Sequence, residues 1–232
     1  MRHLLRTTIA KMKKKWTDTY YSEVLGIHGQ YGEDIILDRL MGNPGSGFYI
    51  DIGANDPNKF SNTLRFYERG WSGINVEPNP VKHRDICAAR QRDTNLNVGV
   101  GPDAAVLPFY VIDPDTLSTF DKKVADVAVR EGFKLAQTLD VQVIRLDDMV
   151  AEHGRGRAID FMSIDVEGFE VPVLSSNDWS KHRARFVMLE VNRAEVEIDA
   201  FMSGIGYIDI FSNGTNKIYA DAQRYRNGSA AQ

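Results

Sequence analysis

The sequence predicts one α/β domain with a mostly parallel sheet and helices on both of its faces. From residue 29 onward, short apolar runs of strand length alternate with amphipathic stretches of helix length. Several of these runs stop at a glycine or a proline. The chain has 232 residues, 43% of them apolar, which is enough to bury a substantial core. We expect the domain to span 29–223, between a basic N-terminal arm at 1–28 and a polar, frayed tail at 224–232.

The first half of the domain alternates regularly. The run at 48–52 is rich in β-branched and aromatic residues and stops at Gly53, as a buried strand does. Ser61 is a suitable N-cap for the next helix, and Gly70 a suitable end. The expected elements are a helix at 30–41, a strand at 48–52, a helix at 61–70, a strand at 73–77, a helix at 80–90 and a strand at 96–100. This order is typical of a parallel sheet wound right-handedly.

The second half begins with a less regular segment. Residues 102–145 contain two apolar strands, 106–111 and 141–144, around a short helix at 124–131, and we interpret them as an elaboration of the core. Alternation then resumes with a helix at 147–153, a strand at 159–164, a helix at 168–175, a strand at 186–191, a helix at 194–203 and strands at 207–211 and 217–220. The pattern gives about seven core strands in all.

Charge is distributed unevenly along the chain. The first 17 residues contain basic side chains and no acidic ones, whereas the whole chain has 28 basic and 32 acidic residues. The arm therefore precedes an acidic body, which argues against nucleic acid as a partner. Leu5, Ile9, Met12 and Trp16 recur at helical spacing, so the arm could contact an anionic membrane surface or an acidic partner, pack on the domain, or extend into solvent.

The sequence contains no signal for export or for a transmembrane segment. No apolar run approaches the ~18 to 20 residues that cross a bilayer, and the N-terminal apolar residues are scattered among charges. The sequence thus predicts a soluble, cytoplasmic protein. Cys87 is the single cysteine, so it cannot form an internal disulfide and is expected to be a buried or idle thiol.

Polar residues at the carboxyl ends of the predicted strands are the candidate functional residues, because open α/β sheets bind ligands there. The first strand ends in Asp51 and the glycine turn at Gly53, followed by Asn55 and Asp56. The second ends in Glu77, where a carboxylate is well placed to accept hydrogen bonds from both hydroxyls of a ribose.

The glycine turn favours a nucleoside cofactor without phosphate. Dinucleotide enzymes use G-x-G-x-x-G, but Gly53 is followed by Ala54, Asn55 and Asp56, and the last would repel phosphate. S-adenosylmethionine has a ribose and two positive charges that acidic strand ends would attract. A nicotinamide or nucleotide-sugar enzyme is disfavoured because the further glycines are missing.

The same residues carry a family resemblance. The chain resembles the FkbM family of S-adenosylmethionine-dependent methyltransferases over roughly 29–192. The segments that carry the resemblance are 30–34, 48–57, 61–63, 70–80, 146–148, 159–170 and 173–174, in the family's order and spacing. The resemblance implies a Rossmann-like seven-stranded methyltransferase fold. It also implies methyl transfer to oxygen, on hydroxyls of sugars in glycans, glycolipids or polysaccharides, or of secondary metabolites.

The resemblance also implies the roles of individual residues. The methionine part of the cofactor would be lined by Asp51, Gly53, Ala54 and Asn55, and the turn would be closed by Asn62 and Thr63. The ribose would be held by Glu77 and the adjoining Pro78, the adenine would lie near Asn97 and Gly99, and Ser118 would reach into the same pocket. The sulfonium and the acceptor would face Asp165, Val166 and Glu167.

The chemistry itself requires a proton acceptor, because a sugar hydroxyl is a poor nucleophile until it loses its proton. Glu167 is the first candidate for the base, Asp165 a positioning residue, and Glu190 at the end of the fifth strand a further candidate. Together such acids could also hold a divalent metal, but we favour a site without one. Methyl transfer to nitrogen or to another small molecule stays an alternative, as does a binding module without turnover.

Overall fold

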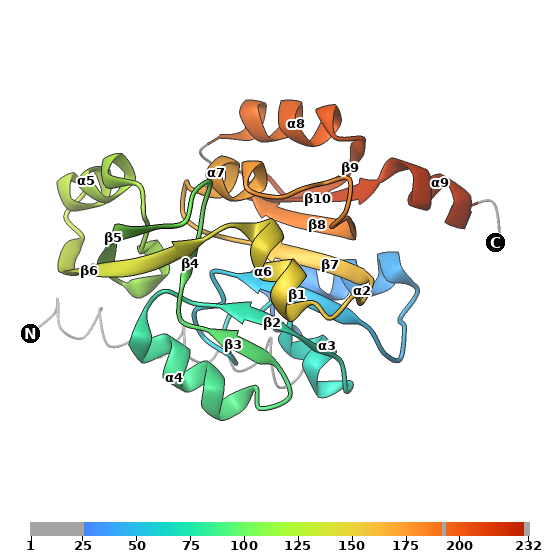
Figure 1. Cartoon of the computed structure of the whole chain (residues 1–232), viewed down its shortest axis with the longest axis horizontal. Helices are drawn as coiled ribbons and strands as arrows, with labels where there is room; N and C mark the ends of the chain where they lie inside the picture. Colours follow the sequence, from blue (N-terminus) through green and yellow to red (C-terminus); the bar gives the residue numbers. More distant parts are fainter. Residues whose placement is uncertain (1–25, 192–193, 230–232) are drawn as a thin grey trace, which may run out of the picture.

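The computed structural model describes residues 26–191 and 194–229 (Figure 1). A seven-stranded sheet in the order β3-β2-β1-β7-β8-β10-β9 forms its centre. These strands are β1 (Phe48–Ile52), β2 (Ser72–Val76), β3 (Thr94–Leu96), β7 (Ile159–Ile164), β8 (Ala184–Glu190), β9 (Tyr207–Ser212) and β10 (Asn216–Asp221). Neighbours from β3 to β8 pair in parallel, and β10 runs antiparallel to both β8 and β9. The predicted mostly parallel seven-stranded fold is confirmed.

Helices cover both faces of this sheet because its central strands are apolar on both sides. In β1, Phe48, Ile50 and Ile52 belong to one core cluster, whereas Tyr49 belongs to the other. The helices that pack into the first cluster are α6 (Leu146–His153), α7 (Glu170–Ser175) and α8 (Glu195–Gly204). Those that pack into the second are α2 (Glu33–Met41), α3 (Leu64–Glu68) and α9 (Ala222–Ser229).

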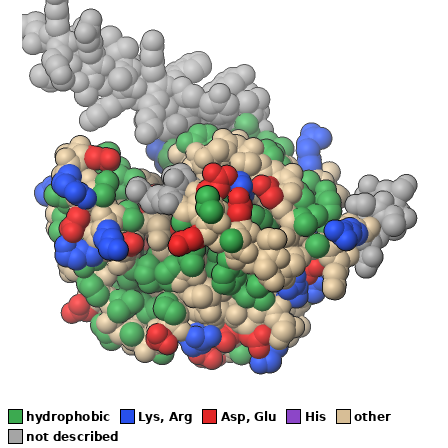
Figure 2. All heavy atoms as spheres, turned by 90° about the horizontal axis from the view of Figure 1, so that it is seen from above, with side chains coloured by type: hydrophobic (Ala, Val, Ile, Leu, Met, Phe, Trp, Pro, Cys, Tyr) green, Lys and Arg blue, Asp and Glu red, His purple; other side chains and the backbone are tan. Residues whose placement is uncertain are grey.

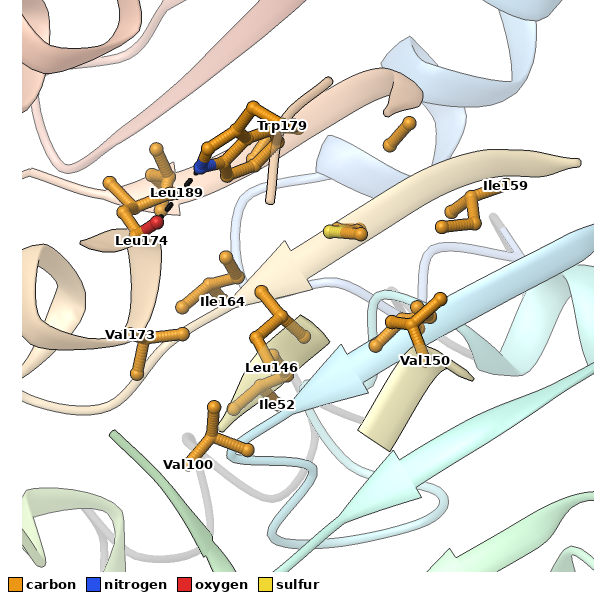
Figure 3. Packing of buried hydrophobic residues seen from close by; sticks show 14 of the residues in the cluster. Ile52, Val100, Leu146, Val150, Ile159, Ile164, Val173, Leu174, Trp179 and Leu189 are labelled. Carbon is orange, nitrogen blue, oxygen red and sulfur yellow. Dashed lines mark hydrogen bonds between the residues drawn. The ribbon is translucent and has the colours of Figure 1, made fainter. Parts of the chain in front are cut away.

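The first cluster lies directly behind the ends of the central strands. Figure 3 shows Ile52, Ile164 and Leu189 of the sheet beside Leu146, Val173 and Leu174 of the helices. Trp179 closes this layer and donates a hydrogen bond from its indole Nε1 to the Leu174 carbonyl at 2.8 Å. Fully burying each of these side chains contributes about 1.5–3 kcal/mol. The strand ends that carry the polar residues are therefore held on a close-packed base.

A second, three-stranded sheet in the order β4-β6-β5 projects beyond one end of the main sheet, at the left of Figure 1. Its elements are β4 (Gly99–Val100), β5 (Ala105–Asp113), the short 3₁₀ helix η2 (Asp115–Leu117), α5 (Lys122–Arg130) and β6 (Lys134–Ile144). Phe120 and Phe169 bring this sheet against the loop before α7, with ring centroids 5.6 Å apart. From above, its α5 end carries basic and acidic side chains among apolar ones (Figure 2).

The prediction of one strand over 96–100 was wrong. β3 ends at Leu96, and β4 starts at Gly99 in the other sheet. The Asn97 amide donates to the carbonyls of Glu77 and Pro78, at 2.8 and 3.0 Å, so the chain turns there. A side chain that hydrogen-bonds nearby backbone competes with the strand ladder, which periodicity alone does not reveal.

The structure describes the predicted C-terminal tail up to residue 229 but little of the predicted N-terminal arm. Most of the basic arm predicted at 1–28 lies outside the described residues. The tail expected to fray from residue 224 instead starts within α9, where Tyr225 packs edge-on against Phe186 with centroids 6.4 Å apart. Within residues 26–191 and 194–229, no helix combines the length and the apolar character that crossing a bilayer requires.

The helix after β2 is α4 (Pro80–Ala89). Proline at its first position and Asn79 as N-cap, whose side chain accepts from the Val81 amide at 3.0 Å, explain why it begins there. Because α4 starts three residues after Glu77, the end of β2 and the first turn of this helix lie on the same side of the sheet edge.

Candidate active site

A cavity of about 720 Å³ lies at the carboxyl ends of β1, β2, β7 and β8, and residues of the small sheet complete its wall. Small-molecule sites in proteins measure about 300–1,000 Å³ and occupy this position in open α/β sheets. Most of the strand-end residues predicted from the sequence line this cavity. They are Asp51, Gly53, Ala54, Asn55, Asn62, Glu77, Pro78, Gly99, Ser118, Asp165, Val166, Glu167 and Glu190.

Position 53 requires glycine because the ends of β1 and β7 approach each other closely there. The φ of Gly53 is +85°, and a Cβ at this position would lie 1.8 Å from the Asp165 carbonyl oxygen. The Asp165 amide donates to the Ile52 carbonyl at 3.0 Å, which draws the ends of β7 and β1 together. The glycine lets the backbone turn sharply between Asp51 and Asn55 and so opens the cavity.

Asp51 is held on the floor of the cavity. The Thr63 hydroxyl donates to its carboxylate at 2.8 Å, and Ser163 stands opposite it in the register of β7. Burial raises the pKa of Asp51 to about 6, although the hydrogen bond from Thr63 and the charge of Arg90 act in the opposite direction. Asp51 therefore ionises more readily when a positive charge enters the cavity.

Glu77 is fixed by two backbone amides. The Asn55 amide donates to its Oε2 and the Asn79 amide to its Oε1, each at 2.8 Å. Burial raises the pKa of Glu77 to about 7, against the opposing effect of these two hydrogen bonds. Each carboxylate oxygen can still accept a further hydrogen bond, so Glu77 is arranged to receive a pair of hydroxyls.

Two of the predicted cofactor residues support the cavity without lining it. Thr63 is 1% exposed and donates to Asp51. Asn97 holds the turn after Glu77 and Pro78 through their carbonyls. Their side chains position residues that do line the cavity, and their assignment as cofactor-binding residues stays a prediction.

The three candidate catalytic acids converge. One carboxylate oxygen from each of Asp165, Glu167 and Glu190 lies within 4.8 Å of the other two. Asp165 is exposed to the cavity but enclosed by protein. Loss of bulk water raises the pKa of Asp165 well above its usual value, and the charges of Glu190 and Glu170 raise it further. The crowding of these acids therefore favours the protonated form of Asp165.

The nearby Glu170 has a different task. It is 2% exposed, and its Oε1 accepts from the amides of Val166 at 3.2 Å and Gly168 at 3.1 Å. These bonds fix the loop between β7 and α7, in which Glu167 adopts a left-handed φ of +52°. The loop thereby presents Glu167 to the cavity in a conformation that non-glycine residues rarely adopt.

Backbone strain is concentrated around this cavity. Among the described residues, five non-glycine residues have positive φ, and Asn55, Phe60 and Glu167 line the cavity. For a bulky residue such as Phe60 this conformation costs about 1–3 kcal/mol, so it persists only where the surrounding structure imposes it. Strain of this kind is typical of functional sites.

Sequence reasoning missed part of the wall. Gln30, Tyr31, Lys59, Phe60, Lys82, Phe109, Asp115, Phe120, Thr215 and Asn216 also line the cavity. Lys82 Nζ lies 2.9 Å from Asp115 and 3.8 Å from Asp56, and thus links α4 to η2 of the small sheet. Gln30 and Tyr31 belong to segment 30–34, which carries part of the family resemblance and could have indicated that they lie near the site. No local sequence pattern identified Thr215 and Asn216.

Across the cavity, the residues fit the sulfonium nucleoside that the sequence predicts. The Glu77 carboxylate at the end of β2 can accept hydrogen bonds from hydroxyls, and the acids of β1 and β7 suit positive charge. Phe109 and Phe120, with ring centroids 4.8 Å apart, line the cavity beside Gly99, where a Cβ would meet the Phe120 ring at 2.4 Å. This glycine and these rings provide an apolar wall for a flat heterocycle.

Comparison with known proteins gives the following matches. A family model described as "Methyltransferase FkbM domain" matches residues 51–208. A search of curated proteins found no match. Among solved structures, the METTL16 methyltransferase domain is similar at 12% identity and a TM-score of 0.50, with 89% of this chain and 78% of that chain covered.

Two further solved structures are more distant. A TehB-like SAM-dependent methyltransferase from Corynebacterium glutamicum has 7% identity and a TM-score of 0.45, with 93% of this chain and 99% of that chain covered. A 1,6-didemethyltoxoflavin N1-methyltransferase from Burkholderia thailandensis, with bound S-adenosylhomocysteine, has 9% identity and a TM-score of 0.42, with 93% and 88% covered.

The family match covers more than half of the chain and contains the ends of β1, β2 and β7 that build the cavity. Similarity to the METTL16 domain supports the Rossmann-like fold alone, because its identity is 12%. The chain belongs to the FkbM family and is an S-adenosylmethionine-dependent methyltransferase.

Proposed function

We propose that this protein is an O-methyltransferase that acts on a hydroxyl of a sugar. One observation carries the proposal: Asp165, Glu167 and Glu190 converge at one end of the cavity, with their carboxylate oxygens within 4.8 Å of one another. A hydroxyl must give up its proton as its oxygen attacks, so it needs a proton acceptor of this kind beside it. An amine acceptor can lose its proton to water beforehand and needs such a cluster less.

The cofactor is held along the ends of β1 and β2 and reaches the acid cluster at Asp165. Glu77 binds the ribose hydroxyls, Asp51 and Asp165 face positive charge, and Asn55 and Gly53 shape the turn around the methionine part. When bound, S-adenosylmethionine supplies a methyl group on a positively charged sulfur, which leaves as a neutral thioether as the acceptor oxygen takes the methyl group.

Glu167 takes the hydroxyl proton. The hydrogen bonds of Glu170 fix the loop that presents the Glu167 carboxylate to the cavity. Asp165 positions the acceptor hydroxyl and Glu190 shares the proton afterwards. The protein contributes alignment and a base, which are the effects that a reaction with an activated methyl donor requires. In our proposal the three acids act without a resident metal.

A methyl-transfer screen tests the proposal. The full chain is incubated with S-adenosylmethionine that carries a tritiated methyl group, together with neutral methyl glycosides, oligosaccharides and, separately, primary amines. We expect label in a carbohydrate product, released together with S-adenosylhomocysteine, and an O-methyl ether in its NMR spectrum. Label confined to the amines would overturn the proposal and leave the cofactor assignment intact. We expect the same turnover with and without EDTA. If EDTA abolished turnover and added Mg²⁺ restored it, the three acids would instead be metal ligands.

A further inference from the structure

Two exposed aromatic rings lie at the rim of the catalytic cavity. Tyr31 is 57% exposed and Phe60 is 38% exposed, and both line the cavity. The other large exposed apolar side chains of the described residues, Val81, Val106, Val129, Phe133, Leu135 and Val196, do not line it. Exposed apolar rings next to a polar cavity mark a place where a ligand is expected to cover them.

The two rings belong to loops that touch each other. Gly29 packs so closely on the Phe60 loop that a Cβ there would lie 2.9 Å from Asn62 Oδ1. Tyr31 is two residues from this contact along its own loop, and its amide donates to Glu33 at 2.8 Å. Both rings therefore stand on neighbouring segments of one rim.

The loop that carries Phe60 is fixed before any ligand binds. Arg90 is 2% exposed and donates to the Pro57 carbonyl at 2.6 Å and to the Ser61 hydroxyl at 3.0 Å. The Asp56 carboxylate accepts from the amides of Asn58 and Lys59, both at 3.0 Å. Between these anchors Phe60 is held at a φ of +55° with its ring exposed. A preorganised ring loses little entropy on binding.

The rim also carries polar groups that suit hydroxyls. Thr215 and Asn216 stand beside Glu190, since Asn216 and Glu190 are register partners of β10 and β8. Asn216 is oriented by Glu33, to which its amide donates at 2.6 Å. Aromatic faces next to amide and carboxylate groups match a pyranose ring, which has an apolar face of C–H bonds and an equator of hydroxyls.

The charge of the cavity restricts the acceptor further. Among the described residues that line it, the acids are Asp51, Asp56, Glu77, Asp115, Asp165, Glu167 and Glu190, and the basic residues are Lys59 and Lys82. Lys82 is paired with Asp115 and Asp56. Lys59 Nζ lies over the Phe60 ring, 5.3 Å from its centroid. Acidic residues outnumber basic ones along the cavity, which favours an uncharged sugar over an anionic one.

We infer that Phe60 and Tyr31 form the acceptor subsite and that it takes an uncharged pyranose, whose apolar face stacks on Phe60 while a ring hydroxyl is presented to Glu167. The inference rests on the proposed function and names its acceptor class. In this arrangement Phe60 determines specificity and does not take part in proton transfer.

The test measures binding of methyl β-D-glucopyranoside to the full chain saturated with S-adenosylhomocysteine, by saturation-transfer NMR. Methyl β-D-glucuronopyranoside, the matched anionic sugar, serves as comparison. Phe60→Gly removes the ring and tolerates the positive φ, Phe60→Tyr keeps the ring, and Phe133→Gly removes a ring that is also 38% exposed but lies outside the cavity.

We expect the glucoside to bind wild type, Phe60→Tyr and Phe133→Gly alike, and Phe60→Gly roughly fivefold to tenfold more weakly, the loss typical of an aromatic contact. S-adenosylhomocysteine affinity should be the same in all four proteins. Equal glucoside binding by Phe60→Gly, equal binding of the glucuronide, or no glucoside binding to the liganded wild type would each overturn the inference. The last result leaves the cofactor role standing, whereas absence of S-adenosylhomocysteine binding would overturn the proposed function itself.

Discussion

The two ends of the catalytic cavity use acidic residues in opposite ways. At the end of β2, Glu77 is fixed by the amides of Asn55 and Asn79. At the ends of β7 and β8, three carboxylates crowd to within 4.8 Å of one another, and one of them, Glu167, lies on a strained backbone. The first arrangement suits recognition of a constant ligand, because a fixed acceptor makes the same hydrogen bonds each time.

The second arrangement suits proton transfer. Crowded carboxylates raise one another's affinity for a proton, and a positioned carboxylate is a suitable proton acceptor. The pKa of Asp165 is raised by enclosure and by the neighbouring charges, whereas that of Glu77 is raised mainly by burial, against its hydrogen bonds. This difference predicts that mutations can separate cofactor binding from catalysis in this cavity.

Glu167→Gln gives the largest expected effect. Gln keeps the size of the side chain but cannot accept the hydroxyl proton, so kcat should fall by roughly 10²- to 10⁴-fold. The Kd for S-adenosylhomocysteine, measured by calorimetry, should stay unchanged. Glu131→Gln, on the exposed loop after α5, is the control and should retain full turnover. If Glu167→Gln turned over normally, the base would have to be another residue.

Glu77→Gln tests the other end. Its amide group can no longer accept at both oxygens, so the Kd for S-adenosylhomocysteine should rise about 10-fold to 100-fold. At saturating cofactor, the KM for the acceptor should change little, because Glu77 lies at the opposite end of the cavity from the acid cluster. If Glu77→Gln left the affinity for S-adenosylhomocysteine unchanged, Glu77 would not bind the ribose.

The pH dependence of stability sharpens the comparison. Asp51 and Glu77 have pKa values near 6 and 7, against ordinary values of 3.8 and 4.5, so the folded chain retains their protons to higher pH than the unfolded chain. Without cofactor, these residues should make the free energy of unfolding fall as pH rises from about 4 to 7. A pKa that is higher by one in the folded chain than in the unfolded chain corresponds to about 1.4 kcal/mol. Urea unfolding followed by circular dichroism at several pH values measures this slope.

The cofactor should reverse part of this loss, because it offers hydroxyls and positive charge to the ionised acids. We expect the increase in Tm caused by S-adenosylhomocysteine to be larger at pH 8 than at pH 5. Glu77→Gln should flatten this dependence relative to wild type. An increase that is the same at both pH values in wild type would contradict the proposed contacts.

Lys82→Met should have the smallest effect. Its ion pair with Asp115 links the main sheet to the small sheet but is partly exposed, so its loss should cost less than about 1 kcal/mol of stability. Cofactor affinity should fall about threefold, since Lys82 and Asp115 both line the cavity. Lys122→Met, which removes an exposed pair with Asp126 in α5, is the control and should leave that affinity unchanged.

Much of the main sheet could be predicted because its strands are continuous apolar runs that stop at glycine or proline. The run ending at Gly53 and the run before Pro78 became β1 and β2. The small sheet was predicted less well: β6 extends from Lys134 to Ile144, far beyond the predicted 141–144, and most of its residues are exposed. Residues 134–138 of β6 are all exposed, so this part of the strand has no apolar alternation to detect.

The sequence by itself determined that acids end the first, second and fourth core strands, because strand periodicity and turn residues are local properties. Tertiary structure alone decided which of these acids stand together. Glu190 reaches Asp165 and Glu167 because β8 pairs with β7, and Thr215 and Asn216 join them because β10 inserts antiparallel between β8 and β9. Tyr31 and Phe60 line one cavity for the same reason: contacts between distant segments depend on how the whole chain packs.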